Sequence, residues 1–135
     1  MTNFKDFNSQ INSNTFGIMW FTDKALTNET HGFKEFNYLL NGLLSQYLDN
    51  DDLHKDIASN IFFSENFGET FFLLHINVTK TTPEKLKELL TEQINLTSAL
   101  KSENKVILTH NLTNIDLTSE VKRNFPSFEF KKLDF

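Results

Sequence analysis

The fold is decided by residues 60–109, which read NIFFSENFGETFFLLHINVTKTTPEKLKELLTEQINLTSALKSENKVILT. Aromatic and β-branched residues fill two runs, 61–63 and 70–78, and a short turn containing Gly68 separates them. Two such runs joined by a short turn are typical of a β-hairpin. A third apolar run at 105–109 follows a stretch with helical spacing. The order hairpin, helix, strand predicts an α/β fold.

The helix within this stretch is predicted from its first residues. Thr82 supplies a hydroxyl that can cap free N–H groups, and Pro83 occupies the first helical position, where its missing N–H costs nothing. Glu84 places a carboxylate at the positive end of the helix dipole. Apolar residues at helical spacing extend the predicted helix over 83–101.

The segments before the hairpin predict a helix, a strand and a second helix. Apolar residues at i, i+3 and i+7 indicate a short N-terminal helix over 4–11. Residues 16–22 are apolar on both faces, which is typical of a central strand covered on both sides. An apolar stripe predicts one helix over 32–49, with Gly42 in its interior, and residues 53–58 suggest one further turn.

Two patterns complete the secondary structure, and a third predicts the core. Spacing of i, i+4 and i+8 indicates a short helix over 117–125, stopped before Pro126. Residues 127–133 alternate between apolar and charged side chains, as a strand with one wet face does. Along the long hairpin strand, a core-facing stripe is predicted from strict alternation and consists of Phe72, Leu74, Ile76 and Val78.

The predicted fold class is α/β (α+β), in a single domain of 135 residues. The element order is α, β, α, β, β, α, β, α, β. Its middle section, βαββαβ, is the order of a ferredoxin-like split βαβ fold, in which two helices cover one face of a mixed sheet; the N-terminal helix and the C-terminal α–β unit are then additions. The alternative is a three-layer α/β/α sandwich, in which the strands of 105–109 and 127–133 are parallel across a right-handed crossover.

Composition narrows the classes of function. The net charge is −5, Arg123 is the single arginine and the lysines form no dense stripe, so nucleic acid and membrane are not expected as partners. The sequence has no cysteine, no signal-peptide pattern and no long apolar segment, which favours the cytoplasm. The four glycines form no phosphate-binding motif and no nucleophile motif occurs, so no cofactor is expected.

Four histidines are candidates for acid–base chemistry: His31, His54, His75 and His110. In the ferredoxin-like order, the strands carrying His75 and His110 run in the same direction on either side of the Trp20 strand. Sites commonly lie where such strands end, so Trp20, His75 and His110 form a possible pocket. The simpler interpretation is favoured because about two strand spacings separate the imidazoles: His75 is a buried structural residue and His110 is solvated. Ligand spacing is poor and thiols are absent, so no metal site is expected.

The densest charge feature is an acidic run of four residues, Asp49, Asp51, Asp52 and Asp56. A calcium-binding EF-hand loop starting at Asp49 would need glycine at its sixth position and glutamate at its twelfth, and neither is present. Carboxylates at the end of a helix oppose its dipole, which favours a role in binding a Lys- or Arg-rich partner. The alternative is a solvated helix end.

These observations leave two classes of function. The favoured class is a non-catalytic protein-binding module, an acidic immunity or toxin-inhibitor-type protein that neutralises a basic protein partner through the four aspartates. The alternative is a small-molecule-binding protein or a cofactor-free enzyme that uses His75 and His110. An enzyme is less expected, because the candidate catalytic residues are isolated from one another in the sequence.

Overall fold

The computed structural model describes most of the chain, and five strands and four helices lie in that part. The described residues are 7, 9–11, 15–48, 59–66, 69–97 and 106–135. The strands are β1 (Thr15–Thr22), β2 (Ser59–Asn66), β3 (Glu69–Asn77), β4 (Val106–Asn111) and β5 (Glu129–Lys132). The helices are α2 (Phe33–Leu39), α3 (Leu43–Leu48), α4 (Pro83–Thr97) and α5 (Thr118–Asn124).

The strands form one mixed sheet in the order β2-β3-β1-β4-β5. Strands β3, β1, β4 and β5 are parallel neighbours, whereas β2 pairs antiparallel with β3 through the predicted hairpin. Strand β1 is therefore central, and every one of its residues is buried. The prediction of a strand covered on both faces is confirmed.

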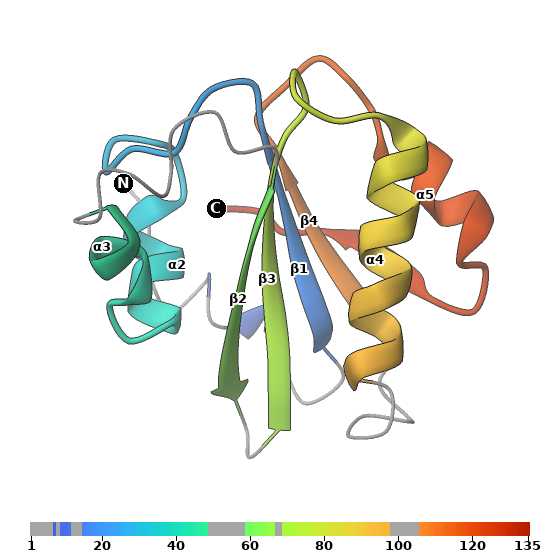
Figure 1. Ribbon diagram of the computed structural model, residues 1–135. Helices are drawn as coiled ribbons and strands as arrows, with labels where there is room; N and C mark the ends of the chain where they lie inside the picture. Colours follow the sequence, from blue (N-terminus) through green and yellow to red (C-terminus); the bar gives the residue numbers. More distant parts are fainter. Residues whose placement is uncertain (1–6, 8, 12–14, 49–58, 67–68, 98–105) are drawn as a thin grey trace.

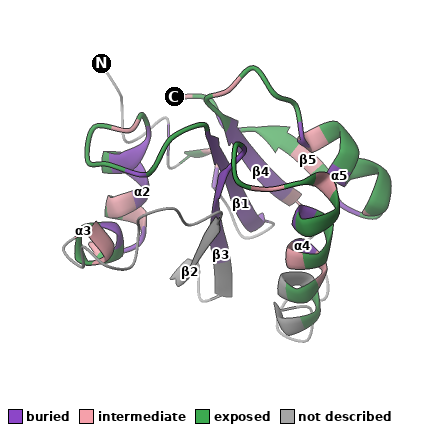
Figure 2. Ribbon diagram, turned by 45° about the horizontal axis from the view of Figure 1, so that its top comes forward, coloured by how far each residue is buried: buried purple, intermediate pink, exposed green. Residues whose placement is uncertain are grey.

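Helices cover both faces of the sheet (Figure 1). Helices α2 and α3 lie on one side, and α4 and α5 lie on the other, so that buried strands separate two helical layers (Figure 2). The direction of travel along the sheet explains this division. From β1 to β3 the chain advances toward one edge of the sheet, and from β3 past β1 to β4 and β5 it advances toward the other edge. Right-handed crossovers that advance in opposite directions place their helices on opposite faces of the sheet.

The ferredoxin-like arrangement is not confirmed, because its two helices would cover one face of the sheet. The α/β class is confirmed, and the layers agree with the three-layer alternative. The parallel pairing of β4 with β5, in which Ile107 lies opposite Phe130, also agrees with that alternative.

The predicted helix over 32–49 is wrong in one respect, since it is broken into α2 and α3. Asn41 and Gly42 have φ angles of 56° and 87°, in the left-handed region that ends a helix. The N–H of Gly42 donates to the carbonyl of Asn37 at 2.8 Å, which closes α2. The Asn37 side chain then accepts a hydrogen bond from the N–H of Ser45 at 3.1 Å, which tethers α3 to α2.

Other local predictions are confirmed. The hydroxyl of Thr82 accepts a hydrogen bond from the N–H of Lys85 at 3.2 Å, capping α4. Val121 of α5 is buried. Phe128, just before β5, is also buried, whereas Glu129 is exposed. The helix predicted over 4–11 and the turn predicted over 53–58 lie largely or wholly outside the described residues, although Phe7 and Ile11 are described and buried.

Two hydrophobic clusters fill the spaces between the sheet and its helical layers. The cluster beneath α4 and α5 includes the predicted stripe of β3, namely Phe72, Leu74, Ile76 and Val78. Glycine is required at position 17 of β1, because a Cβ there would lie 2.3 Å from the ring of Phe72. The cluster beneath α2 and α3 is rich in aromatic rings and includes Phe7, Trp20 and Phe36.

Candidate functional site

The candidate site begins with a row of three side chains across the centre of the sheet. Trp20 of β1 lies in register with His75 of β3 on one side and with His110 of β4 on the other. Trp20 is fully buried, His75 is 1% exposed and His110 is 9% exposed. The two imidazoles therefore flank the Trp20 strand on parallel neighbours, as the sequence predicts.

His75 is held as a neutral imidazole inside the fold. Its Nε2 lies 2.8 Å from the hydroxyl oxygen of Thr22, and that hydroxyl donates to the carbonyl of Lys24 at 2.8 Å. Because the hydroxyl has a single proton, His75 Nε2–H must be the donor to Thr22. Burial lowers the pKa of His75 to about 4.

His110 pairs with a histidine from the loop after β1. His110 Nε2 lies 2.9 Å from Nδ1 of His31, and the ring of Phe135 stacks on both imidazoles, at centroid distances of 4.4 and 5.2 Å. The pKa of His110 is lowered to about 4 by burial and by the neighbouring His31. A hydrogen bond to the Leu133 backbone and the charge of Asp134 act in the opposite direction.

These contacts assign the protons of the histidine pair. A backbone hydrogen bond that raises a histidine pKa is one in which the ring donates, so His110 donates to Leu133. Because Nε2 faces His31, the donor is the other ring nitrogen, Nδ1. Neutral His110 then accepts the Nδ1 proton of His31 at Nε2, which leaves Nε2 of the exposed His31 as the outward-facing nitrogen of the pair.

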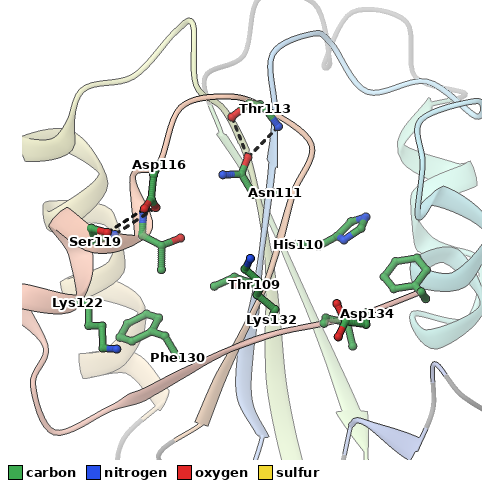
Figure 3. A pocket seen from close by; sticks show the side chains of 13 residues that line it. Thr109, His110, Asn111, Thr113, Asp116, Ser119, Lys122, Phe130, Lys132 and Asp134 are labelled. Atoms are coloured by element: carbon green, nitrogen blue, oxygen red, sulfur yellow. Dashed lines mark hydrogen bonds between the residues drawn. The ribbon is translucent and has the colours of Figure 1, made fainter.

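A cavity of about 650 Å³ opens at the carboxyl ends of β4 and β5 (Figure 3). Its lining includes His110 and Phe135 from the aromatic side, Asp116 and Lys122 from the α5 side, and Lys132 from the end of β5. A smaller cavity of about 280 Å³, lined by His31 and Leu112 among others, lies at the carboxyl end of β1. The histidine pair thus contributes one imidazole to each cavity.

Of the three residues that the sequence groups as a possible pocket, Trp20 and His75 are in edge-to-face contact, with ring centroids 5.4 Å apart. His110 lines the larger cavity, whereas Trp20 packs against Phe36 with ring centroids 4.8 Å apart. The indole N–H of Trp20 is buried and has no hydrogen-bond partner within the described part of the chain. The acidic run Asp49, Asp51, Asp52 and Asp56 lies outside the described residues, as does His54.

Sequence reasoning missed the role of His31. The residue is 79 positions from its partner, and no spacing rule connects the two. A signal was nevertheless present, because His31 lies in the loop that follows β1, and such loops meet at the carboxyl edge of a parallel sheet.

Comparison with known proteins gives no relative from which to assign the chain. No family model, no curated protein and no solved structure matches it. Within the described residues, no group of three or more histidine, aspartate or glutamate side chains is placed as metal ligands are. No described helix has the length and apolar character needed to span a bilayer.

Proposed function

We propose that this domain binds a small polar ligand at the carboxyl edge of its parallel strands. One observation carries the proposal: a cavity of about 650 Å³ lies at the ends of β4 and β5 and is lined by hydroxyl, amide and charged side chains together with two phenylalanine rings. Sites for small molecules have volumes of roughly 300–1,000 Å³ and combine apolar walls with a few polar groups.

The position of the cavity supports the same proposal. In open sheets with parallel strands, ligands bind outside the carboxyl ends, where the chain turns to opposite sides of one strand. Strand β1 is that strand here, because β3 and β4 flank it. The His31–His110 pair lies beside its carboxyl end, and the larger cavity adjoins it.

The polar groups of the cavity are held in place before any ligand arrives. The carboxamide oxygen of Asn111 accepts hydrogen bonds from the N–H and the hydroxyl of Thr113 at 2.9 and 2.8 Å. Asp116 accepts from the hydroxyl of Ser119 at 2.8 Å. Preorganised groups lower the entropic cost of binding.

A pair of matched variants tests the proposal. Thr118→Phe fills the cavity, whereas Glu120→Phe introduces the same ring at an exposed position of α5 that does not line it. In an amide NMR screen with small polar compounds, we expect shifts to gather at Asn111, Thr113 and Ser119 in wild type and in Glu120→Phe, and to be lost in Thr118→Phe. Hits that shift other regions, or that bind Thr118→Phe equally well, would contradict the proposal.

A second candidate function, binding of a basic protein partner as an immunity or toxin-inhibitor-type protein does, is favoured by charge. The chain has a net charge of −5, and four aspartates gather within eight positions, 49–56. Complementary charge acts mainly by accelerating association. Replacing the four aspartates by asparagine should therefore slow association with a co-purified basic protein and flatten its dependence on ionic strength; equal rates at low salt would exclude this surface.

A further inference from the structure

The charges that line the larger cavity are two lysines and two aspartates: Lys122, Lys132, Asp116 and Asp134. Their formal sum is zero, so the preference of the cavity for a charged ligand depends on which of the four groups remains available. The contacts of each group answer that question.

The carboxylate of Asp116 already has hydrogen-bond partners within the protein. Its carboxylate accepts hydrogen bonds from the N–H of Thr118 at 3.0 Å and from the N–H and hydroxyl of Ser119 at 3.3 and 2.8 Å. The hydrogen bond from the Ser119 hydroxyl is the largest of the causes that lower the pKa of Asp116. The negative charge is therefore already satisfied by three donors at the start of α5.

Asp134 lies at the end of the cavity near His110, away from Lys122 (Figure 3). In Figure 3, Asp134 and His110 lie toward one side, Lys122 and Phe130 lie toward the other, and Lys132 lies between them. The main chain of Asp134 is fixed by the side chain of Gln10, whose Oε1 accepts its N–H at 2.8 Å. Its charge raises the pKa of His110, which indicates that this carboxylate acts on the histidine end.

The two lysines, in contrast, form no close ion pair within the described residues, although the charge of Lys132 contributes to the lowered pKa of Asp116. Among the described residues, neither Lys122 nor Lys132 forms an ion pair, whereas the adjacent Lys131 lies 3.6 Å from Glu129 outside the cavity. Of the four cationic residues in the segment 122–132, Lys122 and Lys132 line the cavity, whereas Arg123 and Lys131 do not. The cavity thus presents two ammonium groups without a close ion-pair partner in the described part of the chain, whereas the carboxylate of Asp116 already accepts three hydrogen bonds.

We infer that the ligand of this cavity is a small organic anion, whose carboxylate or phosphate group binds between Lys122 and Lys132. The half-buried ring of Phe130 provides the apolar wall beside them. An ammonium group acts as a point charge toward either anion, so the two ligand types share one recognition chemistry. The inference rests on the proposed ligand-binding function and specifies the chemical class of the ligand.

Four aromatic probes of similar size test the charge preference: benzoate, phenyl phosphate, the neutral benzamide and the cationic benzamidine. Binding is measured by amide NMR titration on wild type, on the double variant Lys122→Gln/Lys132→Gln and on Lys131→Gln as the matched control. For wild type and the control, we expect Kd values for benzoate and phenyl phosphate at least about tenfold below that for benzamide, which corresponds to 1.4 kcal/mol. The double variant should lose this preference. The ratio between the two anions distinguishes a carboxylate ligand from a phosphate ligand.

The outcomes separate the inference from the function on which it rests. Benzamide or benzamidine binding as tightly as the anions, or an equal loss of anion affinity in Lys131→Gln, would overturn the anionic preference while leaving a ligand-binding cavity. Binding of no probe at these residues would overturn both the inference and the proposed function.

Discussion

The face of the sheet beneath α4 and α5 packs apolar side chains such as Phe21, Leu74 and Ile107, whereas the face beneath α2 and α3 also buries polar rings. On the second face, the imidazole of His75 and the indole N–H of Trp20 lie within the same core as the aromatic rings. The first face is stabilised by the removal of apolar area from water. The second carries groups whose free energy depends on hydrogen bonding and protonation.

Both layers contribute side chains to the candidate site. His110 and Phe135 line the larger cavity from the aromatic side, whereas Lys122 belongs to α5 and Phe130 packs against the cluster beneath α4 and α5. The ring of His110 has an edge-to-face contact with Phe36 and a stacked contact with Phe135, and Phe7 packs edge-to-face against both phenylalanine rings.

The largest expected effect tests the apolar face. Leu74→Ala removes a fully buried side chain from the cluster beneath α4 and α5, and we expect a loss of about 2–5 kcal/mol in the free energy of unfolding. No titratable group belongs to this cluster, so the loss should be the same at pH 7.5 and pH 5. Urea denaturation at both pH values measures this loss of unfolding free energy. An unchanged denaturation midpoint would show that Leu74 is not part of the core.

Acidification tests the face beneath α2 and α3, which buries the imidazole of His75. The pKa of His75 is about 4 in the fold and about 6.5 in the unfolded chain, so the unfolded state binds its proton first. Stability contributed by neutral His75 is complete above pH 6.5 and falls as the pH decreases toward 4. From pH 7.5 to pH 5, the loss amounts to about 2 kcal/mol for this residue.

His75→Gln separates this contribution from that of other titrating groups. Glutamine retains an N–H donor for Thr22 but does not titrate, so the variant should lose about 2 kcal/mol less than wild type over the same pH interval. Comparison of urea midpoints for both proteins across that interval gives the difference. Parallel pH profiles would show that His75 is not held neutral by burial.

A smaller effect tests the hydrogen bond that holds His75. Thr22→Val keeps the side-chain shape but removes the oxygen that accepts from His75 Nε2 and donates to Lys24. A buried donor without a partner costs about 1–3 kcal/mol. Thr22→Ser restores the hydroxyl, and should recover most of the unfolding free energy measured at pH 7.5. Equal stability of the valine and serine variants would contradict the assigned hydrogen bond.

The local elements could be read from the sequence, and their assembly could not. The hairpin, α4 and β5 were predicted because alternation, capping residues and turn residues act over a few positions. The break at Asn41 and Gly42 was missed because an apolar stripe continues across it, although the glycine was visible in the sequence. The division of the helices between two faces depends on the parallel pairing of β1 with β3, a contact between distant segments that no local pattern encodes.

The candidate site shows the same limit. His75 and His110 were placed on either side of Trp20 because the direction of neighbouring strands follows from element order. The partner of His110 was not found, since the His31 contact requires the loop after β1 to reach the end of β4. Contacts made by loops at a sheet edge depend on the whole topology rather than on periodicity.

The smallest expected change in stability, and the sharpest test of the polar face, comes from His31→Ala. His31 is exposed, so the loss of its hydrogen bond should cost only about 0.5–1.5 kcal/mol. The pKa of His110 should nevertheless rise, because the electrostatic effect of His31 lowers it. It should remain below the ordinary value, since burial is the larger cause.

The imidazole resonances of His75 and His110 can be followed together by NMR from pH 7.5 to 4, and His75 serves as the internal control. His75 contacts Thr22 rather than His31, so its pKa should stay at about 4 in the variant. An upward shift confined to His110 would establish the pair as a coupled unit. If the pKa of His110 did not rise in His31→Ala, the coupling of His110 to His31 would be contradicted.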